Sequence, residues 1–554
     1  MPDHSIVWPA DYIASFFRSW LQDGKFAPDD LRMFFGSPYL WQELKYALAL
    51  YLSGLALAWF LRGRGQSPAA ACGAGLLLAF SGYWSTLFSA GHFGWFQWMT
   101  YGVFAFGLVD RAIERGAARY WILLGAVLAW GSLHQPDLWL LFTVFTAIYF
   151  LYRTLIYRFV DSSVRRFVDS SILTGTVSGK VFWTRWFLGG LLALASLVAI
   201  GAAGFRSAFV NDLAGRDAQI AKGETLGANA KESADARWIF VTNWSLPPAE
   251  VEEFFSARHL GDTSCPLTLS LARKAGKGTL PYTGALGRPL GAAQGNYRQH
   301  SLYVGPITLV FAFLALVSFI LSITLGTKHS ALGTKHSALS TKHSALSTDI
   351  AFFTIAAIVF LLFSFGRYAE PVYRLVYALP FGDYLRAPVK WHHLTEFSLA
   401  VLAGYGLDAA AKFAESKLKP AALKFVPLAV FAVAFLGAAD LARVDALYCA
   451  PVDVSRARAT GKEMQLTIVP DQALRSREAT EMIRRGDLVV EGRYALQRGA
   501  SIVGILKSRE KPAPASFGPV TLILGIVSLI GTFSVIGFTI LQFVLEKRRK
   551  GAVC

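Results

Sequence analysis

Acidic and imidazole side chains suited to proton transfer occur in short polar segments between long apolar stretches. Asp11 lies in Pro9–Tyr12, His92 lies in a Ser-Ala-Gly-His-Phe-Gly turn, and His134 and Asp137 share a His-Gln-Pro-Asp turn. A carboxylate or an imidazole beside a reacting hydroxyl can remove its proton. The sequence therefore predicts a candidate catalytic set of Asp11, His92, His134 and Asp137.

Basic side chains cluster in another short segment, Tyr384–His393. It contains Arg386, Lys390, His392 and His393. Cationic side chains bind phosphate oxygens through short, charge-assisted hydrogen bonds. We expect these residues to form a substrate-binding site for a phosphate at the membrane surface. Such a site would suit a lipid-phosphate donor whose tail stays in the bilayer.

Each of these residues also has a purely structural interpretation. Histidine, tryptophan and tyrosine often anchor the ends of membrane spans, and Asp137 after Pro136 is well placed to cap a helix. Arg386 and Lys390 differ, because they lie in a short loop on the side that usually lacks cations. That position favours a functional role. The same belt interpretation applies to Trp95, Trp98 and Trp130.

The elements that position these residues are about eleven apolar stretches of the length expected for membrane spans. The chain is 54% hydrophobic and 16% charged, with a mean hydropathy of +0.41. We predict an all-α polytopic membrane protein with small extracytoplasmic mixed α/β segments. The predicted spans are 44–61, 68–90, 93–109, 121–130, 138–152, 187–205, 302–325, 350–365, 394–411, 425–439 and 520–544.

Basic residues in alternate loops indicate the orientation. Arg62 and Arg64 follow the first stretch, and Lys547 and Arg548 follow the last. Because cytoplasmic loops carry excess Lys and Arg, these ends are predicted to be cytoplasmic. The formal charge of +17 is thereby explained by topology, and we expect no nucleic-acid partner. The predicted location is the inner (plasma) membrane, with a cytoplasmic C-terminus.

This topology divides the chain into alternating membrane and polar regions. The extracytoplasmic parts are an N-terminal segment and two longer segments, of which the second shows strand character around Gly486–Tyr494. The predicted order is 1–43 outside, 44–205 in the membrane, 206–300 outside, 301–442 in the membrane, 443–517 outside, 518–545 in the membrane and 546–554 inside.

The predicted orientation places residues before Leu44 outside the cytoplasm. Met1–Trp41 is polar and aromatic and lacks the charged-apolar-small order of a signal peptide. We therefore expect an upstream span to be missing from the sequence. The segment would then be a remnant of the first outer loop, and Asp11 a surviving acidic residue of it.

Two predicted cytoplasmic loops contain repeats. Residues 327–348 repeat TKHSALG or TKHSALS three times, and RFVDSS occurs twice, from Arg158 and from Arg166. The heptad repeat has no apolar stripe wide enough for a coiled coil. Its histidines could suggest metal binding, but a tandem duplication tolerated in a flexible linker is the simpler interpretation.

Several chemical signatures are absent from the sequence. It contains no GxxxxGK[ST] phosphate loop, HExxH or CxxC metal spacing, or GxSxG elbow. No metal ligands are therefore assigned, and the cofactor stays unknown, because no spacing decides for or against a divalent metal. Ionisable residues are scarce in the predicted spans, which weighs against a proton-coupled carrier. Cys265 and Cys449 both fall outside and could pair.

Several short motifs, in order, resemble the YfhO family of bacterial membrane proteins. They include Phe365–Tyr368, Leu385–Lys390 and Leu402–Asp408, together with Phe80–Tyr83 before Gly91-His92. The run Pro281–Gly284 before Tyr303–Gly305 also fits. The resemblance extends over most of the chain from Leu44 to Ala411.

The resemblance implies similarity to the GT-C superfamily of glycosyltransferases. These polytopic enzymes take a sugar from a polyprenyl-phosphate carrier and transfer it on the extracytoplasmic side. The expected partners are the bilayer, a polyprenyl-phosphate-linked sugar and an extracytoplasmic acceptor, either a cell-envelope glycan or a protein. A carboxylate of the first outer loop would act on the acceptor hydroxyl, and basic residues would stabilise the departing phosphate. The match near Asp11 is poor. The alternatives are a transporter or flippase of a lipid-linked intermediate, and a truncated non-catalytic membrane protein.

Overall fold

The computed structural model describes most of the predicted membrane region. The described residues are 38–82, 93–132, 136–156, 179–207, 236–256, 302–330, 337–379 and 385–448, with three short strands between 464 and 498 and isolated residues elsewhere. Within these ranges the membrane region is helical, as the composition predicts.

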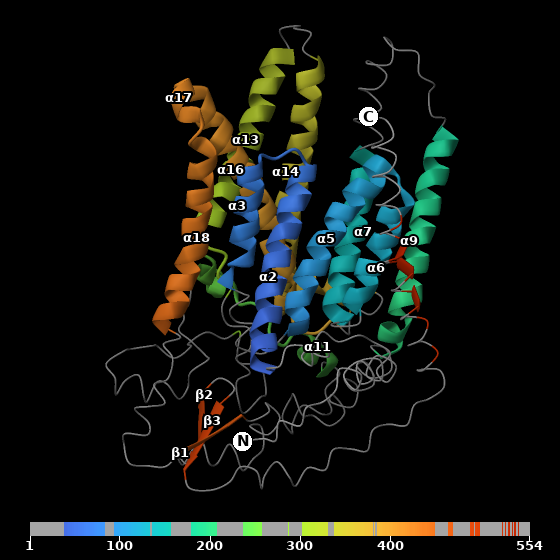
Figure 1. Ribbon diagram of the computed structural model, residues 1–554, viewed down its shortest axis with the longest axis vertical. Helices are drawn as coiled ribbons and strands as arrows, with labels where there is room; N and C mark the ends of the chain where they lie inside the picture. The colour runs from blue at the N-terminus through green and yellow to red at the C-terminus, as the bar shows by residue number, and fades with distance from the viewer. Residues whose placement is uncertain are drawn as a thin grey trace.

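Long helices run side by side in a bundle (Figure 1). Each of them overlaps one of the apolar stretches recognised in the sequence, although several bounds differ. They are α2 (Pro38–Gly63), α3 (Pro68–Ala79), α5 (Phe93–Arg115), α6 (Ala118–Ser132), α7 (Pro136–Ile156), α9 (Gly179–Ser207), α13 (Pro306–Ser330), α14 (Ser337–Ser364), α16 (His392–Lys417) and α18 (Val426–Tyr448).

Length and composition allow fewer spans than the sequence predicts. Among the described residues, five helices are long and apolar enough to cross a membrane, or six if a bent pair counts as one span. The five are Tyr46–Gly63, Leu138–Leu155, Pro306–Thr324, Pro388–Lys417 and Ala421–Ala439. α3 is too short to cross by this criterion, because an α-helix needs about 20 residues for the hydrocarbon core. Because several of its helices are long and apolar enough to cross a membrane, the protein is a multi-pass membrane protein.

The bent pair is the point at which the chain leaves the bundle. Thr348–Ser364 and Gly366–Tyr377 form an angle of 110°. A 3-10 turn, η7 (Gly366–Ala369), connects α14 to the short helix α15 (Glu370–Tyr377). α15 buries Tyr373 and Val376 and exposes Arg374. It is therefore amphipathic, as expected of a helix that lies along a membrane surface.

Aromatic side chains fill the centre of the bundle. Phe106 lies 4.7 Å from Tyr149 and 4.9 Å from Phe397, measured between ring centroids. Phe60 and Phe353 belong to the same buried cluster, with 6.1 Å between their ring centroids. These rings come from α2, α5, α7, α14 and α16. Their tilted and edge-to-face contacts join helices that are distant in sequence.

Charged residues are buried where these helices end. Arg64 pairs with Asp349, and the Arg153 Nε lies 2.6 Å from an Asp110 carboxylate oxygen. The Tyr149 hydroxyl donates to Asp110 at 2.9 Å. This buried network joins α5, α7 and α14 to the turn after α2. Buried charges are tolerated when each is paired and hydrogen-bonded. The sequence indicated few ionisable groups inside the bundle, so this network was not predicted.

The described residues of the heptad repeat, 327–330 and 337–348, are helical, contrary to the flexible linker expected from the sequence. α13 extends into the first repeat as far as Ser330, and α14 begins at Ser337. Alanine, leucine and lysine have high helix propensity, and Ser337–Thr348 contains no glycine or proline. The repeats thus extend the C-terminal end of α13 and the N-terminal end of α14.

A small antiparallel sheet lies in the segment for which strand character was predicted. Its strands are β1 (Met464–Ile468), β2 (Leu488–Glu491) and β3 (Tyr494–Arg498), in the order β1-β3-β2. Glu491 pairs with Tyr494, so a two-residue Gly-Arg connection joins β2 to β3. Glycine at the first central position is typical of a type II′ hairpin turn.

Candidate functional site

Three segments that are distant in sequence form a layer over one end of the bundle. We call residues 236–256, 364–369 and 385–393 the cap. The backbone N–H of Ala387 donates to the Val241 carbonyl at 3.1 Å, and that of Leu246 donates to Ser364 at 2.9 Å. The cap includes α11 (Ala236–Val241) and the 3-10 turns η6 (Pro248–Phe254) and η9 (Pro388–Trp391). It therefore fixes the end of α14 against the start of α16.

Arg367 holds the first part of the cap in place. Its guanidinium donates to the Thr242 carbonyl at 2.7 Å and to the Asn243 Oδ1 at 2.9 Å. Its backbone N–H donates to the Ser245 Oγ at 3.0 Å. Asn243 begins an Asn-Trp-Ser sequence, which is a formal N-glycosylation sequon, but it is fully buried. The folded cap leaves no access for a glycan at this asparagine.

Gly366 permits this close contact. Its φ is +50°, a conformation that side chains disfavour. A Cβ at this position would overlap the Ser245 Oγ and lie 2.6 Å from the Pro388 side chain. Only glycine therefore allows η7 to pack directly against the 3-10 turn that starts α16.

Two larger residues of the cap adopt the same left-handed conformation. Trp244 has a φ of 59° and Ala387 a φ of 64°. The Val389 N–H donates to the Trp244 carbonyl at 3.1 Å, so the two strained positions lie in hydrogen-bonded segments. Non-glycine residues in this region cost of order 1–3 kcal/mol each, and such strain clusters at functional sites.

Arg386 is held between two aromatic rings. Its guanidinium carbon lies 4.6 Å from the Phe240 ring centroid and 4.4 Å from that of Trp244. Cation–π contacts of this kind orient a guanidinium without neutralising its charge. Both residues with a left-handed backbone conformation adjoin Arg386: Ala387 follows it in sequence, and the Trp244 ring contacts its guanidinium.

Lys390, His392 and His393 lie directly after Arg386 at the start of α16. Their exposed fractions are 6%, 0% and 2%. The His392 ring centroid is 4.8 Å from that of Phe254 in η6. Of the four residues predicted for phosphate binding, these three are thus buried within the cap, whereas Arg386 is partly exposed.

Glu396 adds a carboxyl group to this cluster. It lies one helical turn after His392 on α16, is 1% exposed, and has the Ser81 hydroxyl beside it. An ionisable residue inside a membrane span is by default a candidate functional residue. The sequence showed Glu396, but we placed it near the end of a span. α16 packs against α3, α13 and α14, and Glu396 is buried within this bundle.

Most of the predicted catalytic set falls outside the described residues. This applies to Asp11, His92 and His134. Asp137 is in the first turn of α7, but its side chain is outside the described part. Their assignment stays a prediction. Arg367 and Trp244 were not among the predicted site residues, although Arg367 is part of the Phe365–Tyr368 motif.

Comparison with known proteins gives no match. No protein-family profile, curated protein or solved structure matches this chain. Within the described residues, no group of three or more His, Cys, Asp or Glu side chains could hold a metal ion. The chemistry of the site must therefore be argued from the cap itself. Its cations can bind an anion, and its imidazoles, together with the Glu396 carboxyl group one turn further along α16, can exchange protons.

Proposed function

We propose that the chain is a membrane glycosyltransferase that takes a sugar from a polyprenyl-phosphate donor. The acceptor is a cell-envelope glycan or protein on the extracytoplasmic side. The observation that carries this proposal is the grouping of Arg386 and Lys390 with His392 and His393 at one end of a membrane span. A donor whose tail lies in the bilayer presents its phosphate at that depth.

In the proposed reaction the acceptor hydroxyl attacks the anomeric carbon of the donor. A new glycosidic bond forms, the bond between that carbon and the phosphate oxygen breaks, and the lipid phosphate leaves. A carboxylate removes the hydroxyl proton, and Asp11 or Asp137 is the proposed base. Arg386 and Lys390 stabilise the negative charge that develops on the departing phosphate.

The motifs that resemble the YfhO family support this proposal by their location. Phe365–Tyr368 contributes Arg367 to the cap, and Leu385–Lys390 contributes both proposed phosphate ligands. Residues that are scattered in sequence thus belong to a single layer. The likeness to GT-C transferases, the span number of about eleven and the extracytoplasmic location of the cap are parts of the same proposal.

The burial of Lys390 implies a conformational step. In the described conformation Lys390 and both imidazoles are buried within the cap. We therefore infer that residues 236–256 of the cap move away before the donor phosphate reaches Lys390, while Arg386 makes the first contact. Lids that close over a substrate in this way also exclude water from the reaction.

Transport of a lipid-linked intermediate is the second candidate function. Glu396 favours it, because carriers place ionisable residues inside the membrane and this carboxyl lies in the span Pro388–Lys417. A flippase would move the lipid between leaflets and form no new bond. A non-catalytic membrane protein would do neither.

One reconstitution experiment separates these functions. The full chain is placed in proteoliposomes with a polyprenyl-phosphate sugar that is labelled in the sugar, and an acceptor glycan is added outside. The transferase proposal predicts label in the acceptor, and loss of that label in the Arg386→Gln/Lys390→Gln double variant. Arg374→Gln, which removes an exposed cation stacked 3.8 Å over Trp238, is the matched control. Label that changes leaflet but stays on the lipid would establish the flippase instead.

A further inference from the structure

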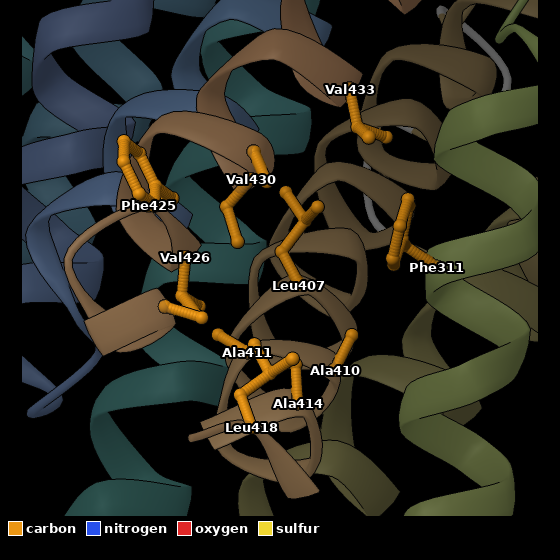
Figure 2. A pocket seen from close by; sticks show the side chains of 12 residues that line it. Phe311, Leu407, Ala410, Ala411, Ala414, Leu418, Phe425, Val426, Val430 and Val433 are labelled. Carbon is orange, nitrogen blue, oxygen red and sulfur yellow. The ribbon is translucent and has the colours of Figure 1, made fainter. Parts of the chain in front are cut away.

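An apolar groove lies at the opposite end of α16 from the cap. Its volume is about 330 Å³. Leu407, Ala411 and Ala414 of α16 face into it, as do Phe311 of α13 and Val430 of α18, and Figure 2 shows their side chains pointing toward a common space. No charged residue lines it.

The groove extends along α16 over the depth of one leaflet. From Leu407 to Leu418, at a rise of 1.5 Å per residue, it is roughly 16 Å long. The hydrocarbon core of a bilayer is about 30 Å thick, so one leaflet is about half of that. The three helices that line the groove are candidate membrane spans. The groove therefore has the length and the surroundings of a single acyl chain.

Lysines surround the end of the groove at which the helices leave the membrane. Lys417, Lys419 and Lys424 are exposed there, in the turn that includes α17 (Pro420–Leu423). The Lys424 ammonium lies 5.1 Å from the ring centroid of Phe425, which lines the groove. No carboxylate of the described residues forms an ion pair with any of these three lysines, whereas Lys412 pairs with Asp408 at 2.6 Å.

The last apolar stretch of this chain does not fill the groove. Val535 packs with Ala126, Ala129 and Ile200, which belong to α6 and α9. These helices lie on the far side of the bundle from α17 and α18 (Figure 1). The acyl chain of a lipid matches the apolar lining of the groove, its length of about one leaflet and the lysines at its end.

We propose that this groove binds one acyl chain of an anionic phospholipid, whose headgroup phosphate is held by Lys417, Lys419 and Lys424. By the positive-inside rule this lipid belongs to the cytoplasmic leaflet. Anionic lipids of that leaflet are attracted by clustered basic residues next to a span. The site is distinct from the cap and does not depend on the proposed glycosyl transfer.

Native mass spectrometry of the purified full chain tests the groove. The probes are a phosphatidylglycerol and a phosphatidylcholine with the same acyl chains. Ala429→Trp puts a bulky ring into the groove from its exposed side, and Ala432→Trp puts the same ring on the exposed surface of α18 outside the lining. We expect Ala429→Trp to weaken binding of both lipids at least about tenfold, because the methylenes of the chain lose their contacts, and Ala432→Trp to leave binding unchanged.

Charge variants test the mouth of the groove. Lys417→Gln/Lys424→Gln should reduce binding of the anionic lipid to that of the zwitterionic one. Arg115→Gln/Arg119→Gln removes a pair of cations near Tyr120, remote from the groove, and should change nothing. Equal lipid binding by the two tryptophan variants would overturn the proposal. So would an oligomer that Ala429→Trp dissociates, since a helix of a second copy would then occupy the groove.

Discussion

Trp244 and Ala387 share a left-handed backbone conformation, and the Val389 N–H, which follows Ala387 by two residues, donates to the Trp244 carbonyl at 3.1 Å. Neither residue adopts this conformation without cost. Two strained residues 143 positions apart in sequence are thus stabilised by the same layer of structure. The Arg386 guanidinium stacks on the Trp244 ring, and the Arg386 backbone directly precedes Ala387. The backbone strain at Trp244 and Ala387 is therefore linked to the position of the Arg386 guanidinium.

Substituting Ala387 with valine should destabilise the cap. A β-branched side chain at a φ of 64° is sterically worse than alanine, and we expect a loss of about 1–2 kcal/mol. Thermal unfolding in detergent would measure it. Ala378→Val is the control, because Ala378 is exposed and has an ordinary φ of −77°. If both variants unfold at the same temperature, the strain at Ala387 is not significant.

Gly366→Ala should separate η7 from the start of α16. The new methyl would overlap the Ser245 Oγ and displace Arg367 from its partners, so we expect a loss of about 2 kcal/mol or more. Gly190→Ala in α9 is the control, since nothing lies within 4 Å of its Cβ position. Limited proteolysis within 236–256 reports cap opening directly. A cap that stays protected in Gly366→Ala would contradict this arrangement.

Neutralising Asp349 should destabilise the whole bundle. Burial alone lowers the pKa of the Arg64 guanidinium, but Asp349 and Asp110 outweigh that effect and hold the pKa well above its ordinary value. A raised pKa of a base means that its stabilisation is present at every pH below the ordinary arginine value. Asp349→Asn removes the closest acidic partner of the buried Arg64 guanidinium and leaves Asp110, 3.9 Å from its Nε, so we expect a loss of about 3–5 kcal/mol.

Glu114→Gln is the control for that prediction. Glu114 lies 3.5 Å from Arg153, but its side chain is 41% exposed, so its removal should cost no more than about 1 kcal/mol. Chemical denaturation of both variants at neutral pH gives the comparison. A loss of similar size in the two would show that burial of the Arg64 network is unimportant for stability.

Arg374 and Lys419 are expected on opposite sides of the membrane. Arg374 is in α15, which follows the end of α14 at the cap. Lys419 follows the end of α16 that lies away from the cap. Both residues are exposed. In a background without the native cysteines, an impermeant maleimide should label Arg374→Cys in intact cells and Lys419→Cys only after permeabilisation. Labelling in the reverse order would invert the orientation derived from the basic loops and place the cap in the cytoplasm.

The positions of the helices could be predicted from sequence because apolar length and basic loops are local signals. The bounds of α2, α7 and α13 follow from them closely. The bend after Ser364 could not be predicted, since it depends on Gly366 packing against Ser245, 121 residues earlier. The pairing of Arg64 with Asp349 is equally non-local, and neither residue alone reveals a buried partner.

The candidate site could be predicted from sequence only in part, because some of its neighbours are distant in sequence. Arg386 and Lys390 are visible as cations in a loop that topology predicts to lack them. The aromatic rings beside Arg386 come from α11 (Phe240) and from the turn after it (Trp244), in a segment that the sequence shows only as a long polar region. Glu396 looked peripheral because it lies near the start of the predicted span, whereas the helices that pack around α16 belong to segments distant in sequence.

The central claim is that the cap binds the phosphate of a lipid-linked sugar through Arg386 and Lys390. Its most direct test is the affinity of the reconstituted full chain for a polyprenyl-phosphate sugar, compared among wild type, Arg386→Gln/Lys390→Gln and Arg374→Gln. We expect the double variant to bind at least about tenfold more weakly, because it lacks two charge-assisted contacts, and Arg374→Gln to bind as wild type does. Equal affinity in all three, with the double variant folded, would contradict the claim.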